Sequence, residues 1–390
     1  MKRIINCGID IGTHAVRVVV VETGKGDDIP FIVGHGYAES NGIRMGYITN
    51  IEAVVTSIKS AMAQAENSAG LKIKRAYVSI GGIGISSETS SGSAIITRAD
   101  KEVTVLDINK ALSECEENLN TQNKKIIHVI PLQYKLDGKE IHGRPEGMKG
   151  AKLEAKTLFV TAIKQHVEDL ATAVTLAGIE VLDIVSGILA ESYILLSEKQ
   201  KAAGCALIDI GAQTVSLAVF ENSTLISLQV FSIGGMDITK DIALGFKIAL
   251  EDAESVKIGA MIGDFPKKRL DEIVDARLGD IFELVENHLR KIKRNGLLPA
   301  GVIITGGGSN IHTIEMVAKQ YLKLPAHLGA QSDQLVSKFK VRDDSWYAAL
   351  ALALSPNLKN SSSVDLSSSV NDSVKNLKGV FKSFLSQLLP

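Results

Sequence analysis

Residues 9–20 read IDIGTHAVRVVV, and residues 208–219 read IDIGAQTVSLAV. Ile, Asp, Ile and Gly recur in register 199 residues apart, and apolar residues continue at alternate positions after them. Alternation of this kind is typical of half-buried strands, so each stretch predicts a strand, a tight turn and a second strand. Because the two copies are offset by about half the length of the chain, they predict two similar α/β lobes.

The composition limits the classes of protein to which the chain can belong. Its 390 residues, 45% hydrophobic and 22% charged, fit a globular chain of two or three domains. The 43 Lys and Arg residues nearly balance 44 Asp and Glu residues, which argues against a globally basic nucleic-acid binder, and we expect no nucleic-acid partner. No apolar run is long enough to span a bilayer, and three distant cysteines favour a reducing cytoplasm.

Helix and strand patterns alternate around the first repeat. Lobe one is expected over 1–83 and 163–197, with its elements at 51–65 (helix), 75–81 (strand), 165–177 (helix), 179–185 (strand) and 188–197 (helix). A different pattern interrupts it at 84–162. There we expect short strands at 93–97, 126–130 and 155–163 and a helix at 107–119, which together predict an inserted small α+β subdomain.

The second lobe is expected over 198–355, with 240–299 as its outer subdomain. Its predicted elements are strands at 225–231 and 301–305 and helices at 236–245, 251–262, 269–293, 311–321 and 344–354. The turn Ile233-Gly234-Gly235 precedes the first of these helices. The architecture is therefore predicted to be α/β with two lobes and one insert.

Three glycine-rich turns follow predicted strands: Asp10–Thr13, Asp209–Thr214 and Gly306–Gly308. Without a Cβ, such turns let backbone N–H groups approach phosphate oxygens, and the hydroxyls of Thr13 and Thr214 could add donors. Carboxylates at the ends of two facing strands suit hydrated Mg²⁺. The alternative is a pair of tight hairpins whose Asp side chains bond to turn amides. Three turns together favour a phosphate site.

This set of turns resembles the actin, hexokinase and Hsp70 ATPase superfamily. Within it, the chain resembles the FtsA family of bacterial cell-division proteins along nearly its whole length. The resemblance rests on GIDIGT at 8–13, MGYITNIEAVVTSIKSAMAQAE at 45–66, HVIPLQYKLDG at 128–138, LAESY at 189–193, DIG at 209–211, EDAESVK at 251–257 and ITGGGSNI at 304–311. It implies a two-lobe actin-like ATPase fold whose insert takes part in filament contacts.

The resemblance also implies that ATP and Mg²⁺ bind between the lobes. The Asp turns would be the phosphate loops, with Asp10 and Asp209 holding Mg²⁺ through water. Glu254 and Lys257 would lie near the ribose and adenine; their i, i+3 spacing fits one helix face, but also a solvated intrahelical ion pair. The nucleotide-binding residues would be Asp10, Gly12, Thr13, His14, Asp209, Gly211, Gln213, Thr214, Gly234, Gly235, Glu254, Lys257, Gly306, Gly307 and Gly308.

The second phosphate loop departs from the family pattern. Relatives commonly have Gly-Gly-Gly-Thr, whereas this chain has Gly211-Ala212-Gln213-Thr214. An added Cβ restricts a residue that needs positive φ and crowds a phosphate, so we expect ATP binding with at most weak hydrolysis. Chaperone-like relatives place a water-orienting Glu near the segment that is Ser186-Gly187 here. Glu191 is close in sequence, but no catalytic residue is assigned.

A basic segment and a basic tail suggest two kinds of partner. Residues 267–277, KKRLDEIVDAR, resemble the lobe edge that receives the acidic tail of the tubulin-like protein FtsZ, and Lys268, Arg269 and Arg277 could pair with it. A solvated helix start explains the same cluster equally well. Residues 356–373 have the Ser- and Asn-rich composition of a flexible linker.

From residue 374 to 390, three lysines accompany an apolar stripe and no acid occurs. This pattern predicts an amphipathic helix that binds a membrane surface; the alternative is a helix that docks on the body or on a partner. The apolar stripe comprises Val374, Leu377, Val380, Phe381, Phe384, Leu385 and Leu388.

Taken with the resemblance, these features predict an actin-like ATP-binding protein that forms filaments on the cytoplasmic face of the cell membrane. It would anchor the FtsZ ring at the division septum, with other division proteins as further partners. A pilus-assembly adaptor of the PilM type is an alternative with the same fold. A small-molecule kinase shares the phosphate loops, but the sequence reveals neither a catalytic base nor a substrate pocket for it.

Overall fold

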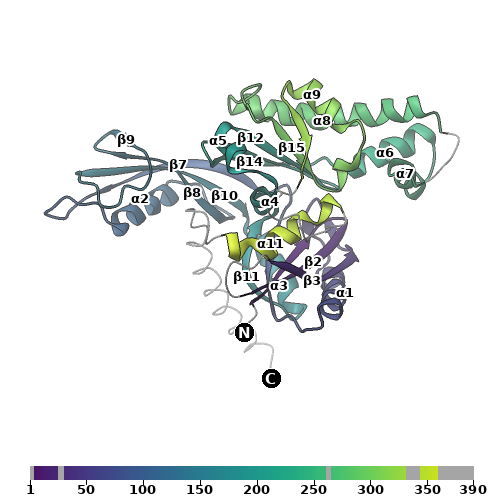
Figure 1. The fold of residues 1–390 in the computed structure, drawn as a ribbon, viewed down its shortest axis with the longest axis horizontal. Coiled ribbons are helices and arrows are strands. Elements are labelled where there is room, and N and C mark those ends of the chain that lie inside the picture. The colour runs from purple at the N-terminus through teal and green to yellow at the C-terminus, as the bar shows by residue number, and fades with distance from the viewer. Residues whose placement is uncertain (1–3, 25–29, 261–264, 331–342, 359–390) are drawn as a thin grey trace. The chain divides into compact units, whose positions relative to one another are not determined.

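The computed structural model describes residues 4–24, 30–260, 265–330 and 343–358. The chain divides into two compact units: one comprises the residues up to Ile85 together with His166–Leu358, and the other contains Ser86–Gln165. The first unit carries two large sheets, each with its helices, besides one short strand pair, and we call the parts around the two large sheets the first and second lobes (Figure 1). Within the described ranges, no helix combines the length and the apolar character needed to cross a bilayer.

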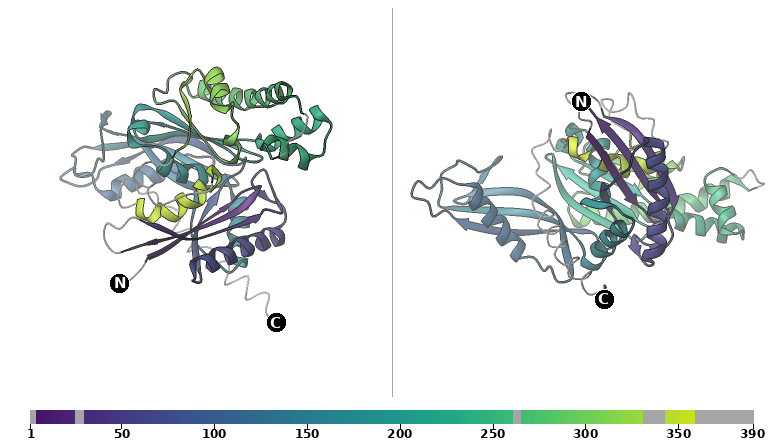
Figure 2. Two further views of the ribbon diagram at one scale, coloured as in Figure 1. Left: turned by 45° about the vertical axis from the view of Figure 1, so that its right-hand side comes forward. Right: turned by 90° about the horizontal axis from the view of Figure 1, so that it is seen from below.

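The first lobe is a five-stranded sheet with the strand order β11-β6-β1-β2-β3. β1, β2 and β3 are antiparallel, whereas β6 and β11 continue the sheet in parallel. Helices α1 and α11 cover opposite faces of this sheet (Figures 1 and 2). The elements are β1 (Ile4–Ile11), β2 (Ala15–Thr23), β3 (Phe31–Glu39), β4 (Ile43–Arg44), β5 (Tyr47–Ile48), α1 (Ile51–Ala69), β6 (Arg75–Ile80), α3 (Lys164–Leu176), β11 (Glu180–Ser186), η2 (Asp344–Trp346) and α11 (Tyr347–Leu358).

Glycines let both helices pack directly on strand backbone. A Cβ on Gly8 of β1 would lie 2.2 Å from the carbonyl oxygen of Ala349 in α11. A Cβ on Gly36 of β3 would lie 1.8 Å from the carbonyl oxygen of Ala61 in α1. Neither position can accept a larger residue without moving a helix.

The second lobe repeats the same strand plan. Its order is β16-β15-β12-β13-β14, with β12, β13 and β14 antiparallel and β15 parallel to β12. The predicted duplication of a strand–turn–strand unit is therefore confirmed. The elements are α5 (Glu198–Ala203), β12 (Cys205–Ile210), β13 (Val215–Glu221), β14 (Thr224–Phe231), α6 (Gly235–Phe246), α7 (Leu250–Lys257), α8 (Lys267–Lys291), β15 (Val302–Thr305), η1 (Gly307–Asn310), α9 (Ile314–Leu322) and β16 (Ala326–Leu328).

One helix touches both lobes. Helix α4 (Gly187–Leu195) contacts β11 of the first lobe and β12 and β13 of the second, and it also packs along α11. Nearly all of its residues are buried, which explains why its apolar pattern has no preferred face. The two lobes are thus joined by packing as well as by the chain.

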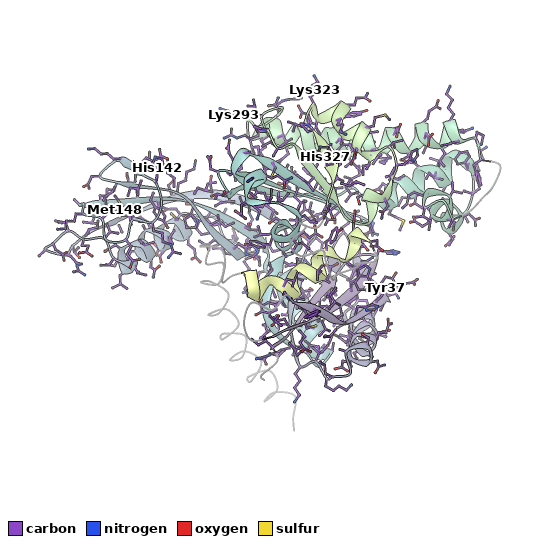
Figure 3. The ribbon with its side chains drawn as sticks, in the orientation of Figure 1. Tyr37, His142, Met148, Lys293, Lys323 and His327 are labelled. Carbon is purple, nitrogen blue, oxygen red and sulfur yellow. The ribbon has the colours of Figure 1, made fainter. Side chains whose placement is uncertain are left out.

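The insert forms its own core. Strands β7 (Ser86–Ile95), β10 (Lys152–Ile163), β8 (Lys124–Leu136) and β9 (Lys139–Ile141) lie in that order as an antiparallel sheet, and α2 (Val105–Glu117) packs on it. Phe159 and Cys115 are buried in the core between helix and sheet. Met148, in the loop after β9, is exposed (Figure 3). The predicted small α+β subdomain is present.

Some predicted boundaries are wrong. Helix α7 ends at Lys257, short of the predicted end at 262, and β7 begins well before the predicted strand at 93–97. Helix α11 continues through Leu358, so the predicted linker cannot start at 356. Strand β3 was not predicted, because its glycines lower strand propensity while providing room for α1. The rest of the linker and the whole predicted tail helix lie outside the described residues.

Candidate functional site

A cavity of about 760 Å³ lies between the first and second lobes. All three glycine-rich turns contribute to its wall, together with α4, α6 and α7. Of the predicted nucleotide-binding residues, the following line the cavity: Asp10, Gly12, Thr13, His14, Asp209, Gly211, Thr214, Gly235, Glu254, Lys257, Gly306, Gly307 and Gly308. Gln213 and Gly234 are not among the lining residues.

The two Asp turns are closed by backbone hydrogen bonds. The Gly12 N–H donates to the Ala15 carbonyl oxygen (3.1 Å), and the Gly211 N–H donates to the Thr214 carbonyl oxygen (2.9 Å). Oδ1 of Asp10 instead accepts a hydrogen bond from Oγ of Ser79 (2.6 Å), a residue of β6. The Asp10 side chain therefore bonds to another lining residue of the cavity. It does not bond to the amides of its own turn, as the alternative interpretation expected.

The pKa values of both acidic side chains are raised. Burial raises the pKa of Asp10, against the Ser79 hydrogen bond and the charge of Arg17. Burial also raises the pKa of Asp209, the charge of Asp10 raises it further, and Arg17 again opposes the shift. Two carboxylates close enough to repel each other in a cavity form a donor set that a divalent cation would neutralise. The residues present therefore fit Mg²⁺.

The third turn lies directly against the second Asp turn. Gly306 has φ +89°, and a Cβ there would lie 2.2 Å from Oδ1 of Asp209 and 2.6 Å from the carbonyl oxygen of Ile210. Glycine is required at this position both by its φ and by the close approach. Gly306–Gly308 and Asp209 therefore share one end of the cavity.

Glu254 and Lys257 lie on one face of α7, as their spacing predicted. Nζ of Lys257 is 2.7 Å from Oε2 of Glu254. The same ammonium group also donates to Oγ1 of Thr239 (2.8 Å) and to the carbonyl oxygen of Gly235 (3.1 Å), both in α6. The ion pair is therefore real, but it is part of a network that joins α7 to the start of α6 at the cavity wall.

Arg17 lines the cavity, although none of the sequence motifs indicates a role for it. Its guanidinium carbon is 5.6 Å from the centre of the Tyr37 ring and 5.9 Å from that of Trp346. Tyr37 is labelled on β3 in Figure 3. The hairpin register places Arg17 opposite Asp10, and this pairing could have been derived from the sequence of the turn alone.

Glu191 of α4 is a second lining residue without a predicted role. Its side chain is 3% exposed, and Oε2 has no hydrogen-bond partner among the described residues. Burial raises its pKa, and the charges of Asp209, Asp10 and Asp344 raise it further. Burial and the neighbouring carboxylates thus favour the neutral form of this carboxyl group over its charged form.

The predicted partner-binding residues differ in their environments. Arg277 forms ion pairs with Asp241 (2.6 Å) and Asp280 (3.0 Å), so carboxylates of the same chain already neutralise it. Arg269 donates to the carbonyl oxygen of Gly245 (2.9 Å), and Lys268 is exposed. The three side chains therefore differ in how many partners of the same chain they already have, and their pairing with an acidic peptide stays a prediction.

Comparison with known proteins identifies the family. Models of "Cell division protein FtsA" and of "SHS2 domain inserted in FTSA" match residues 206–351 and 82–161, respectively. Cell division protein FtsA of Pseudomonas aeruginosa is 32% identical over 344 residues, which cover 83% of this chain and 82% of the relative. The chain belongs to the FtsA family.

Solved structures show the fold of this FtsA-family chain. A "PilM-PilN type IV pilus biogenesis complex" superposes with a TM-score of 0.67 at 17% identity, covering 90% of this chain and 98% of the other. MreB5 of Spiroplasma citri bound to ADP gives 0.51 at 13% identity, covering 92% and 99%. The predicted two-lobe actin-like fold is confirmed, and the insert at 82–161 matches the domain inserted in FtsA.

Proposed function

We propose that the chain binds Mg–ATP in the cavity between its lobes and acts as an actin-like cell-division protein. One observation carries the proposal: the two Asp turns and the turn Gly306–Gly308 line the same cavity. Turns of this kind present backbone N–H groups to phosphate oxygens, and the two repelling carboxylates provide the matching site for a cation.

Each part of the ligand has candidate residues. Asp10 and Asp209 would hold Mg²⁺ through water, and Thr13 and Thr214 would add hydroxyl donors to the phosphates. Glu254, fixed by Lys257, would bond to the ribose. We expect at most weak hydrolysis, because Ala212, which lines the cavity, adds a Cβ to a loop that relatives commonly build from glycine.

The cellular role has three further parts. We infer that the protein forms filaments on the cytoplasmic face of the membrane at the division septum, and that the insert contributes contacts between subunits of a filament. The basic amphipathic segment 374–390 would anchor the filaments to the membrane. The filaments would tether the FtsZ ring through its acidic tail. Lys268 and Arg269 are better candidates for that contact than Arg277, because Arg277 is already paired.

The nucleotide site is tested by titrating ATP with and without Mg²⁺. Asp209→Asn removes one carboxylate of the cation site while keeping the loop, so it should abolish about a tenfold gain in affinity that Mg²⁺ gives the wild type, without weakening metal-free binding. Asp100→Asn, in the insert, is the matched control. Equal ATP affinity with and without Mg²⁺ in the wild type would refute the cation site.

The membrane role is tested by pelleting the protein with vesicles. Filament formation predicts that ATP increases the fraction that sediments with anionic vesicles. A small-molecule kinase would instead turn over a phosphate acceptor in solution, and neither ATP nor vesicles would cause it to pellet.

A further inference from the structure

Side chains of the two Asp turns accept hydrogen bonds from two successive backbone N–H groups of one first-lobe turn. The Met45 N–H donates to Oε1 of Gln213 (2.8 Å), and the Gly46 N–H donates to Oγ1 of Thr13 (3.3 Å). Thr13 belongs to the first lobe, as Met45 does, but Gln213 belongs to the second lobe and is 168 residues away. The Gln213 hydrogen bond therefore crosses from one lobe to the other.

The segment that receives this bond, residues 42–50, is tightly closed on itself, and we call it the strap. The carbonyl oxygen of Gly42 accepts from the N–H groups of Thr49 (2.7 Å) and Asn50 (3.1 Å). Gly46, at φ +84°, packs so closely on Gly82 that a Cβ would lie 2.4 Å from the Gly82 Cα. A segment fixed at both ends is a firm attachment point for a side chain from the other lobe.

The bond lies at the cavity, but Gln213 itself is not part of the cavity wall. Gly46 of the strap and Ala212 of the turn are both lining residues. The Gln213 side chain leaves the loop in the direction of Met45, so it is placed to hold the loop and not to contact a ligand. Gln213 is predicted to bind nucleotide, but the contact that the structure shows for its side chain is with the strap.

We propose that Gln213 is a positioning residue that latches the second-lobe turn onto the strap and thereby keeps the cavity closed. The hydrogen bond exists when the lobes are together and is lost when they separate, so it stabilises the closed state alone. A ligand that contacts both Asp turns binds the closed state, and the latch slows its release. This last step rests on the proposed nucleotide site.

Three variants of the full chain isolate the latch. Gln213→Leu keeps the size of the side chain and removes the acceptor, whereas Gln213→Glu keeps an acceptor oxygen at the same reach. Gln64→Leu is the matched control, because Gln64 bonds to both the N–H and the carbonyl group of Tyr37 within the first lobe. These two bonds do not cross between lobes.

The first measurement is amide hydrogen exchange over residues 43–48 without nucleotide. The Met45 amide should exchange about two- to tenfold faster in Gln213→Leu, the range that one net hydrogen bond provides. Gln213→Glu and Gln64→Leu should exchange like the wild type. Unchanged exchange in Gln213→Leu would refute the latch.

The second measurement is the release of a fluorescent ATP analogue, chased with unlabelled ATP. Release from Gln213→Leu should be about two- to tenfold faster than from the wild type and from Gln64→Leu. Faster amide exchange with an unchanged release rate would show that the Gln213 hydrogen bond does not control how fast the nucleotide leaves the cavity. If the wild type binds no analogue, the proposed function fails, and the amide exchange still decides the latch.

Discussion

Asp10 and Arg17 are directly opposed across the antiparallel β1–β2 hairpin. Opposed residues in such a ladder project from the same face, so the carboxylate and the guanidinium share the cavity side of the sheet. The rings of Tyr37 and Trp346 flank the guanidinium, and its charge opposes the rise in pKa of both Asp10 and Asp209. A positive charge is thus fixed beside the proposed phosphate site.

Arg17→Met should weaken ATP binding at least about tenfold, because a charge-assisted contact is worth about 1.5–3 kcal/mol. Arg17→Lys keeps the charge but loses the planar stacking, so it should restore part of the affinity. Calorimetric titration measures both. Wild-type affinity in Arg17→Met would show that the guanidinium serves the aromatic cluster and not the ligand.

Lys257→Met should lower the free energy of unfolding by about 1–2 kcal/mol, because the substitution leaves Glu254, Thr239 and the Gly235 carbonyl without a shared donor. Lys240→Met is the control: it breaks an exposed i, i+3 pair with Asp237 and should cost less than about 0.5 kcal/mol. Urea denaturation compares the two variants. Equal losses would mean that the α6–α7 network contributes no more than a surface pair.

A buried histidine, His166, and a half-buried one, His288, predict loss of stability in acid. Burial lowers the pKa of His288, whose Nε2 is 2.8 Å from Oγ of Ser227, and also lowers the pKa of His166. The unfolded chain then binds more protons than the folded chain at pH values below about 6.5, so the free energy of unfolding falls as pH decreases through that value.

His288→Gln should therefore reduce the drop in melting temperature between pH 7.5 and pH 5.5. His327→Gln changes an exposed histidine of β16 and should leave the drop as in the wild type. Melting curves at a series of pH values make the comparison. An identical drop in His288→Gln and the wild type would show that other groups control the acid sensitivity.

Phe381→Glu should release the protein from vesicles, even as filaments. Seven apolar side chains provide on the order of 10 kcal/mol, at roughly 1.5 kcal/mol each. Ordering about fifteen residues, at about 1 kcal/mol or more each, offsets all of this before helix hydrogen bonds are counted. One tail is therefore a weak anchor, and filaments bind by presenting many.

Ser383→Glu adds the same charge outside the apolar stripe and is the matched control for this test. Co-sedimentation with anionic vesicles, with and without ATP, measures both variants. Undiminished pelleting of Phe381→Glu would show that the segment serves another contact.

The local features of the site could be predicted from the sequence. Each Asp turn is specified by a few adjacent residues, and the i, i+3 spacing of Glu254 and Lys257 determines their shared face. Contacts between distant residues could not be predicted. Nothing local indicates that Ser79 bonds to Asp10, 69 residues away, or that Gln213 reaches Met45.

Two further features depend on contacts between distant residues. The glycines of β3 weaken its local strand signal, but the packing of α1 requires them. Arg277 looked available in a basic segment, and its i, i+3 pair with Asp280 could have been foreseen. Its stronger partner, Asp241, lies 36 residues earlier on another helix. Tertiary contacts decide these cases.

The close contact between Gly8 and α11 links the last described helix to the strand that ends in the first Asp turn. Helix α11 is the last described element before residue 359, and its backbone touches β1 two residues before Asp10. A substitution that shifts α11 away from Gly8 would therefore also disturb the packing of the strand that carries the proposed cation ligand. The packing of α11 and the position of Asp10 thus depend on the same backbone contact.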